Sequence, residues 1–318
     1  MRILLKPRIP MIILVTAVVL SACGQVRQSS EYPIDSAGTL RLVAANYPIF
    51  DFTRSIVDDS AEVRLIVPPG ADPHHWEPSP RDLQDIHRSH LLLYSGVGLE
   101  HWLERLLSSA EGRLTLRDVS VGIEPLQTAG EIDPSDGSHG KHVEEHADPH
   151  LWLDPLRASQ QAANIAEILA EQNPEAAELY RMRAGELQAK MLTLHQRYLD
   201  GLSHCRSRAL LSEHGAYHYL AERYQLEFHS IAGLASESEP SPARMVELVK
   251  LIEERGIPAV FLEPQSNRRF AETLAHETGI GIYELNPIES ITADQAALGL
   301  DYIALMEQNL RQLQQGLG

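Results

Sequence analysis

Residues 173–203 read NPEAAELYRMRAGELQAKMLTLHQRYLDGLS and carry the longest helical pattern of this 318-residue chain. Asn173 and Pro174 supply an N-cap and a proline at the first helical position. Apolar side chains then recur at i, i+4, i+7 and i+11, which makes one continuous stripe on a helix. They are Leu187, Met191, Leu194 and Tyr198. Roughly 30 residues at 1.5 Å each make a rod of about 45 Å, so we interpret this segment as a bridge between two lobes. Two shorter helices broken at Gly185 are the alternative.

Short apolar runs alternate with helical patterns on both sides of this segment. Before it, we predict strands at 40–45, 62–67, 90–94 and 114–118, with helices near 48–58, 79–87 and 99–110. After it, we predict strands at 208–212, 226–231, 258–262 and 280–284, with helices near 215–223, 241–255, 266–277 and 294–314. Alternation of this kind is typical of parallel βαβ units. The chain is therefore predicted to be an α/β protein with four strands in each half.

The N-terminus has the pattern of an export signal. Basic residues precede ten apolar residues, Met11–Leu20, a run too short to span a bilayer as a helix. The following Leu20-Ser21-Ala22-Cys23 is similar to a bacterial lipobox, in which the cysteine becomes the acylated N-terminus. An ordinary signal peptide with a chance cysteine is the alternative. We predict a signal peptide at 1–22, a tether at 23–38, a first lobe at 39–172, the bridging helix at 173–204 and a second lobe at 205–318.

The composition excludes some functions and raises one question. The chain has 27 Lys+Arg against 44 Asp+Glu, a formal charge of −17, which argues against a nucleic-acid partner because phosphate binding needs a basic surface. It has only two cysteines, so Cys205 is expected to be an unpaired, buried, small residue rather than part of a disulfide. Its 15 histidines, against 5 Phe and 3 Trp, need an explanation.

Three histidines occupy loop positions where an α/β sheet binds ligands. His74 follows the predicted strand 62–67 and His214 follows the predicted strand 208–212, and ligands bind beyond the carboxyl ends of such strands. His74 and His150 each follow an Asp-Pro pair, which fixes a turn. Taken singly, each is equally well a capping or core histidine. Together they predict a metal site that the fold must assemble, because at least 64 residues separate one from the next.

Four motifs, in this order, resemble the substrate-binding proteins of bacterial zinc/manganese ABC transporters. They are DPHHWEPSP (72–80), DPHLWLDP (148–155), HGAYHY (214–219) and VFLEPQ (260–265). The resemblance covers residues 40–314 nearly throughout. It implies two (β/α)4 lobes bridged by one long helix, with the metal in the inter-lobe cleft. It also implies an extracytoplasmic location.

The resemblance extends to the metal ligands. The third ligand is His in the zinc branch and usually Glu in the manganese branch. Here it is His214, and three neutral imidazoles suit Zn²⁺ better than Mn²⁺. Many members carry an Asp in a Leu-Asp-Pro turn as fourth ligand, whereas this chain has LNPIES at 285–290. Because a neutral amide is a weak zinc ligand, we expect Glu289 to replace it, with Asn286 or a water as alternatives. The expected ligands are His74, His150, His214 and Glu289.

Further residues are expected to support this site. Glu77 and Glu263 are predicted to hydrogen-bond to ligand imidazoles and fix their tautomers, although they could equally be simple loop carboxylates. Residues 128–147 are predicted to form a surface loop. Within it we hypothesise a low-affinity zinc-collecting role, against that of a merely solvated loop, for His139, His142 and His146.

The resemblance implies a binding protein rather than an enzyme. It would capture Zn²⁺ outside the cytoplasm and deliver it to the permease of an ABC importer, as a monomer attached to a membrane through lipid on Cys23. Four protein ligands would leave no open position for a reactive water. Affinity is expected to fall below about pH 6.5, since only neutral imidazoles bind metal. The alternatives are a manganese-binding homologue, a surface adhesin of the same fold and, remotely, a zinc hydrolase, for which the sequence has no His-Glu-x-x-His motif.

Overall fold

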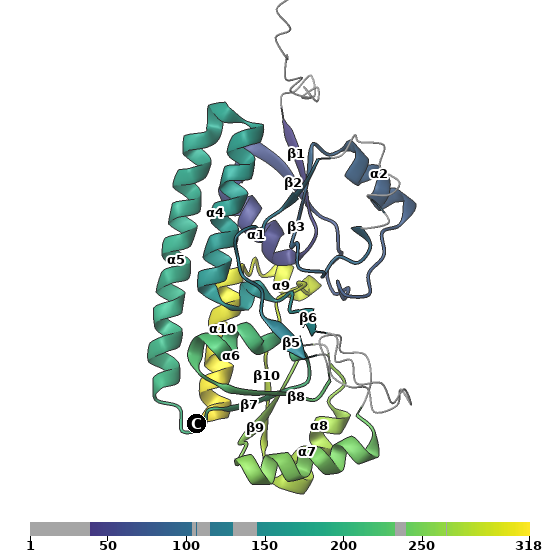
Figure 1. The fold of residues 1–318 in the computed structure, drawn as a ribbon, viewed down its shortest axis with the longest axis vertical. Coiled ribbons are helices and arrows are strands. Elements are labelled where there is room, and N and C mark those ends of the chain that lie inside the picture. The colour runs from purple at the N-terminus through teal and green to yellow at the C-terminus, as the bar shows by residue number, and fades with distance from the viewer. Residues whose placement is uncertain (1–38, 104–105, 107–114, 130–144, 233–239, 265) are drawn as a thin grey trace, which may run out of the picture. The chain divides into compact units, whose positions relative to one another are not determined.

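A computed structural model describes residues 39–103, 106, 115–129, 145–232, 240–264 and 266–318 (Figure 1). They belong to one compact unit, residues 34–318. The predicted signal peptide and tether, including Cys23, lie outside the described residues. Within the described residues, no helix has both the length and the apolar content that crossing a membrane requires.

The N-terminal half contains a parallel sheet whose described strands have the order β2-β1-β3-β4. The central strands β1 and β3 are the more deeply buried, because their side chains pack on both faces of the sheet. The strands are β1 Leu40–Ala44, β2 Ala61–Leu65, β3 Leu91–Tyr94 and β4 Leu116–Asp118. The strands predicted for this half are confirmed, with ends that differ by one or two residues.

The C-terminal half repeats this topology. Its described strands are parallel in the order β10-β9-β7-β8, so the first strand of each half pairs with both the second and the third. The strands are β7 Ala209–Ser212, β8 Glu227–Ser230, β9 Ala259–Leu262 and β10 Gly281–Glu284. The strands predicted for this half are confirmed as well.

Three of the helices between the described strands, α1, α2 and α7, begin at residues whose side chains cap them. Ser79 accepts a hydrogen bond from the backbone N–H of Asp82, whose side chain accepts one from Ser79 in return, and Ser241 caps its helix in a similar way. The helices are α1 Tyr47–Val57, α2 Pro80–Arg88, α6 His218–Tyr224, α7 Pro242–Arg255 and α8 Arg269–Thr278. Half of the predicted helix near 99–110 lies outside the described residues, so this prediction is not tested.

The prediction of a single helix near 294–314 is wrong. The structure has two helices there, α9 Ala293–Ala297 and α10 Tyr302–Leu317. Gly299 between them has a φ of +66°, which ends the first helix because left-handed backbone cannot continue a right-handed turn. The side chain of Asp301 then accepts a hydrogen bond from the N–H of Ala304 and caps the second helix.

The bridging helix is present as α5, Ala177–Ser203, and it runs without a break through Gly185. Its 27 residues make a rod of about 40 Å. It packs against α1 from the first half and α10 from the second, so it lies along both (Figure 1). A short 3₁₀ turn, Pro174–Ala176, precedes it, and Asn173 makes no side-chain capping bond. Asn173 and Pro174 therefore occupy the predicted N-cap and first positions, but of the 3₁₀ turn rather than of α5 itself.

A second long helix, α4 Pro155–Gln172, was not predicted. It lies antiparallel to α5 (Figure 1) and packs along it. Its buried side is made largely of small residues, among them Ala158, Ala162 and Ala166. The pair α4 and α5 forms a common support for both sheets.

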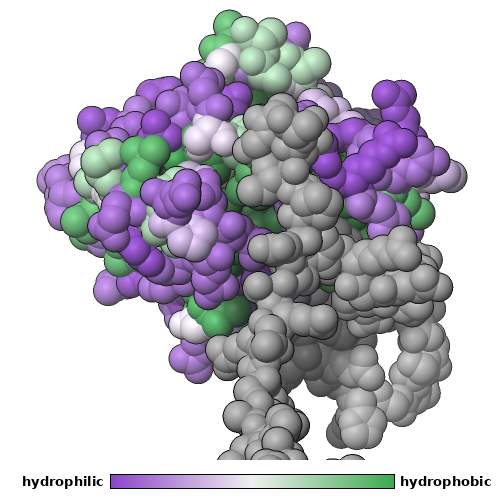
Figure 2. All heavy atoms as spheres, turned by 90° about the horizontal axis from the view of Figure 1, so that it is seen from above, coloured by the Kyte–Doolittle hydropathy of each residue, from purple (hydrophilic) through white to green (hydrophobic). Residues whose placement is uncertain are grey.

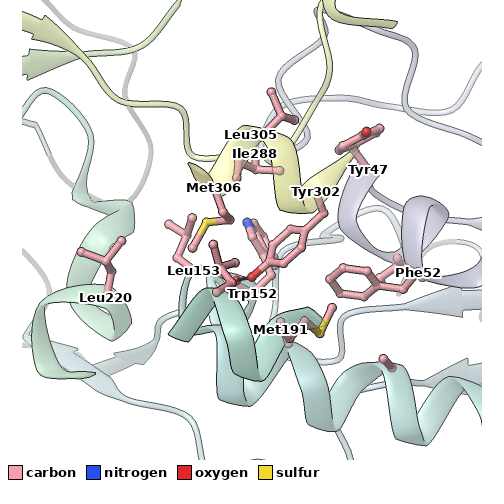
Figure 3. Packing of buried hydrophobic residues seen from close by; sticks show 14 of the residues in the cluster. Tyr47, Phe52, Trp152, Leu153, Met191, Leu220, Ile288, Tyr302, Leu305 and Met306 are labelled. Carbon is pink, nitrogen blue, oxygen red and sulfur yellow. Dashed lines mark hydrogen bonds between the residues drawn. The ribbon is translucent and has the colours of Figure 1, made fainter. Parts of the chain in front are cut away.

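One hydrophobic core extends through both halves. Leu42 and Leu93 from the first sheet, and Phe261 from the second, belong to the same buried cluster. At its centre the ring of Tyr302 meets Phe52 edge-on, with centroids 4.9 Å apart (Figure 3). The opposite faces of the two sheets have separate small cores, one against α2 and the other against α7 and α8. The halves therefore share an interior and are not independent lobes joined by a loose linker.

The predicted surface loop 128–147 is partly a strand pair. β5 Gln127–Ala129 and β6 Glu145–Ala147 pair in antiparallel fashion, and residues 130–144 between them lie outside the described residues. On the face seen in Figure 2, the coloured residues are mostly hydrophilic, with apolar side chains among them.

Candidate metal centre

Four side chains from distant parts of the chain converge between the two halves. His74 follows β2, His150 precedes the 3₁₀ turn Leu151–Leu153, His214 follows β7 and Glu289 follows β10. Each offers one ligand atom, and these atoms all lie within 4.8 Å of one another. Three of the four come from loops beyond the carboxyl ends of strands, which is where α/β sheets bind their ligands.

The carboxylate of Glu289 sits among the three imidazoles. Its Oε1 is 2.8 Å from His150 Nε2 and 3.6 Å from His214 Nδ1, and its Oε2 is 3.4 Å from His74 Nε2. Two ligands at about 2.05 Å from a tetrahedral zinc ion lie about 3.3 Å apart. The distance to His74 Nε2 is close to that value. The 3.6 Å distance is to Nδ1 of His214, which also contacts Glu263, and the 2.8 Å contact with His150 is a hydrogen bond that an incoming ion would replace.

The four side chains are buried, and their charges stabilise one another. The four side chains are at most 7% exposed. Burial alone would raise the pKa of Glu289, yet the charges of His74 and His214 hold it well below its usual range. Within the described residues, His74 Nε2 is buried without a hydrogen-bond partner. A buried polar atom of this kind calls for an explanation, and an ion bound among the four groups would provide it.

His150 is held by a carboxylate that sequence reasoning did not assign. Asp148 Oδ1 accepts hydrogen bonds from the backbone N of His150 at 2.9 Å and is 2.7 Å from its Nδ1. Burial would lower the pKa of His150, but Asp148 and Glu289 raise it to about 10. Burial would likewise raise the pKa of Asp148, but His150 lowers it to about 2. The sequence did contain a signal for this contact, because Asp148 stands two residues before His150 in the Asp-Pro-His motif.

Asp148 is itself fixed from the second half of the chain. Its Oδ2 is 3.0 Å from Nδ1 of His218, and its backbone carbonyl accepts a 2.7 Å hydrogen bond from the hydroxyl of Tyr219. Both partners lie on α6. Because Nδ1 of His150 faces Asp148, its Nε2 is left to face the centre.

The two glutamates expected to support the site differ in position. Glu263 Oε1 is 2.8 Å from His214 Nδ1, the contact expected of a residue that orients an imidazole. Glu77 is exposed. Beside His74, Asp72 Oδ1 accepts a 2.8 Å hydrogen bond from the backbone N of His74.

The remaining candidates are not members of the four-residue cluster or lie outside the described residues. The side-chain oxygen of Asn286, the alternative fourth ligand, accepts a 2.7 Å hydrogen bond from the backbone N of Ile288. His146 lies in β6, and His139 and His142 lie outside the described residues, as does Cys23. Cys205 carries a free thiol packed against the core.

A cavity of about 380 Å³ leads to the centre. Its described lining includes His214 and Glu289 together with Glu213, Glu263 and Asp72, and contains no lysine or arginine. Residues of both halves contribute to it. A cavity with this charge favours cations over anions.

Comparison with known proteins supports a metal-handling function. The family model described as ZnuA, zinc-uptake complex component A periplasmic, matches residues 42–316. The zinc-binding lipoprotein AdcA of Streptococcus pneumoniae is 31% identical over 300 residues, 94% of this chain, which spans 58% of that relative's length. The high-affinity zinc uptake system protein ZnuA of Bacillus subtilis is 32% identical over 299 residues, 93% of each chain.

Solved structures give the same fold. The Zn(II)-bound ZnuA-like domain of S. pneumoniae AdcA matches with a TM-score of 0.75 and 30% identity, over 88% of this chain and 99% of that one. The laminin-binding protein Lmb of Streptococcus agalactiae, described as bifunctional with adhesin and metal transporting activity, matches with a TM-score of 0.76 and 26% identity, over 88% of this chain and all of that one. With a family match over residues 42–316, this chain belongs to the ZnuA family of periplasmic zinc-uptake components.

Proposed function

We propose that this protein is the zinc-binding component of an ABC metal importer. It captures Zn²⁺ outside the cytoplasm and delivers it to a membrane permease. The observation that carries the proposal is the buried cluster of three imidazoles and one carboxylate, His74, His150, His214 and Glu289. Zinc accepts this set of nitrogen and oxygen ligands in tetrahedral geometry.

The ligand set also favours zinc over manganese. Imidazole nitrogen suits Zn²⁺, whereas Mn²⁺ prefers carboxylate, carbonyl and water oxygens in octahedral geometry. Four protein ligands fill a tetrahedral site, so no position remains for a reactive water. This supports a carrier role rather than that of a zinc hydrolase.

Release of the ion is proposed to involve small movements. The α4 and α5 pair packs against both halves, and the core is continuous between them. Wide hinge opening would expose that core, so a shift of the ligand loops or a slight rotation of one half is the less costly route.

The location and attachment are part of the proposal. Cys23 would carry lipid, hold the protein on the outer side of a membrane and place a monomer near its permease. The segment with His139, His142 and His146 would collect zinc loosely and pass it to the cavity beside the centre. A protein lacking residues 130–144 would then load more slowly at low zinc concentration, with an unchanged equilibrium affinity.

A metal competition experiment tests the zinc assignment. The purified protein is equilibrated with equal zinc and manganese, and its metal content is measured by mass spectrometry. We expect one zinc per chain. His150→Ala and Glu289→Ala should weaken zinc binding by more than about 100-fold, since groups that only orient ligands are already worth about 10–100-fold. His276→Ala, at an exposed histidine on α8, is the control. Preferential retention of manganese would overturn the proposal.

A second role as an adhesin is a candidate because of one observation. The fold is similar to that of Lmb, whose description includes adhesin activity. Binding of laminin by the zinc-loaded protein, compared with the His150→Ala variant, would test this. The absence of saturable binding in both would exclude it.

A further inference from the structure

The residue that precedes Glu289 has an unusual backbone conformation. Ile288 has a φ of +60°, although it is β-branched and its side chain is fully buried. The other described non-glycine residues with positive φ, Asp58 and Gln225, directly follow α1 and α6, where left-handed residues are common. Ile288 ends no helix. A β-branched residue in this region is an outlier that persists only if its surroundings hold it.

Asn286 holds this conformation from within the turn. Its Oδ1 accepts a 2.7 Å hydrogen bond from the backbone N of Ile288, the arrangement of an Asx turn. Asn286 is fixed in turn by Asn309 on α10. Asn309 Oδ1 accepts from the backbone N of Asn286 at 2.9 Å, and its Nδ2 donates to the carbonyl of Asn286 at 2.7 Å. Asn309 is 2% exposed, so this two-bond clamp is shielded from water.

The first half of the chain holds the carbonyl groups on either side of Ile288. Trp152 Nε1 donates a 2.7 Å hydrogen bond to the carbonyl of Pro287. The backbone N of Tyr47 donates to the carbonyl of Glu289 at 3.2 Å. Ile288 itself lies in the buried cluster with Trp152 (Figure 3). Both halves therefore fix the turn, and the carboxylate of Glu289 has little freedom to move.

We infer that Asn286 and Ile288 are positioning residues that hold Glu289 at one place among the three histidines and thereby favour Zn²⁺ over Mn²⁺. This inference rests on the proposed zinc function. Zinc accepts four close ligands, whereas manganese favours a larger octahedral shell of oxygens. A carboxylate free to shift could bind through both oxygens and admit water, which would accommodate manganese. A carboxylate held by a locked turn cannot adjust in this way.

The test compares three variants of the full protein. Asn286→Ala removes the acceptor for the N–H of Ile288, and Asn286→Ser retains a neutral hydroxyl acceptor at the same position. Asn164→Ala is the matched control, because Asn164 also ties down a loop by side-chain hydrogen bonds, to the carbonyls of Val119 and Val121. The readouts are the rate of zinc loss to excess chelator, the zinc-to-manganese ratio at equilibrium and the visible spectrum of the Co²⁺-loaded protein.

For Asn286→Ala we expect zinc loss to be faster by about 10-fold or more, a larger bound share of manganese and a changed cobalt spectrum. Asn286→Ser should recover most of the difference, and Asn164→Ala should behave as wild type in all three readouts even if its melting temperature falls. Wild-type rate, ratio and spectrum in Asn286→Ala would overturn the inference, whatever its stability.

A further variant and the behaviour of the wild-type protein cover the remaining outcomes of this test. If Asn286→Ala does not fold, Ile288→Gly frees the same turn while leaving Asn286 in place, and the same acceleration of zinc loss is expected. Wild-type kinetics in that variant would refute the inference. If the wild-type protein itself binds no zinc, the proposed function fails and this inference fails with it. If the wild-type protein binds zinc and the variants behave like it in all three readouts, the inference fails while the proposed function stands.

Discussion

Asp154, at the start of α4 in the first half, accepts two hydrogen bonds from Arg223 of α6 in the second half, from Nε at 2.9 Å and from Nη2 at 2.7 Å. The same oxygen is 3.1 Å from Nη1 of Arg157, and the other oxygen caps α4 by accepting from the N–H of Leu156. Asp154 has no exposed surface. A buried carboxylate, four residues after His150, thus joins the two halves of the chain.

Replacing this carboxylate should strongly destabilise the protein. Asp154→Ala removes the carboxylate that binds Arg223 and one of the two carboxylates that bind Arg157, which also pairs with Glu222. It also removes the cap of α4, and breaking a buried pair typically costs about 3–5 kcal/mol. Urea unfolding measures the loss. Glu167→Ala, which breaks the exposed pair of Glu167 on α4 with Arg181, should cause no measurable change. Equal effects of the two substitutions would contradict the importance of the buried contact.

Zinc binding should release protons well above neutral pH. Burial would lower the pKa of His150, but Asp148 and Glu289 raise it to about 10 in the metal-free protein. A raised pKa means that the protonated imidazole stabilises the metal-free fold fully below about pH 6.5, and that this contribution disappears as the pH rises towards 10. Zinc must displace the proton, so affinity should increase about tenfold per pH unit per proton between these limits. The sequence predicted a loss of affinity below about pH 6.5. The raised pKa of His150 predicts in addition that affinity already depends on pH above this value.

Calorimetry in buffers of different ionisation enthalpy counts these protons. At pH 8.5 we expect about one proton per zinc from His150. In Asp148→Asn one of the two charges that raise the pKa of His150 is lost, and that of Glu289 remains. A smaller fraction of the imidazole is then protonated at pH 8.5, so the count should fall. An unchanged count in this variant would show that Asp148 does not control the protonation of His150.

His218 should influence zinc affinity without touching the ion. It hydrogen-bonds to Asp148, which orients His150. Removing an outer partner of this kind typically weakens metal binding about 10–100-fold. We expect His218→Ala to fall within this range and His218→Gln, which retains a donor, to be closer to wild type. Zinc titration against a competing chelator provides the measurement, and identical affinities for all three proteins would argue against the role.

Glu100 should make the fold less stable at alkaline pH. Its Oε1 accepts hydrogen bonds from the backbone N of Ser95 and from Asn46 Nδ2, but burial raises its pKa to about 7. Because the folded protein binds this proton more tightly than the unfolded chain, the stabilisation is complete below about pH 4.3 and is lost as the pH rises through 7. Glu100→Gln should therefore raise the melting temperature at pH 8.5 and leave it unchanged near pH 4.5. Glu124→Gln, at an exposed position, is the control.

Much of the fold was predictable from the sequence, because each sheet has a central strand that is an uninterrupted run of apolar residues. β3 and β9 are continuous apolar runs that are buried in the middle of parallel sheets. The bridging helix was predictable from its apolar stripe. α4 was missed because alanines build much of its buried side and give little hydropathic contrast, although Asp154-Pro155 is a recognisable start of a helix.

The ligands of the candidate site were easier to predict from the sequence than the residues that hold them in place. His74, His150 and His214 could be proposed from loop position and resemblance, and the structure brings them together. Glu289 could be preferred to Asn286 on ligand chemistry alone. The turn that carries Glu289 to the three histidines could not be predicted, because it includes the positive φ of Ile288 and tertiary hydrogen bonds from Trp152 and Asn309. The contact of Asp148 with His150 lies within the Asp-Pro-His motif and could have been predicted, whereas its contacts with His218 and Tyr219 of α6 are contained in no local pattern.

At least 64 residues separate each of the four candidate ligands from the next. An unfolded chain would therefore have to close three long loops to bring these ligands together, and each closure costs conformational entropy. No short segment of the chain contains two of the ligands. Zinc should thus bind this set only in molecules that have completed folding, and by mass action it should protect them from unfolding and proteolysis. Metal supply would then act as a selection step that preserves finished molecules and leaves incomplete ones to degradation.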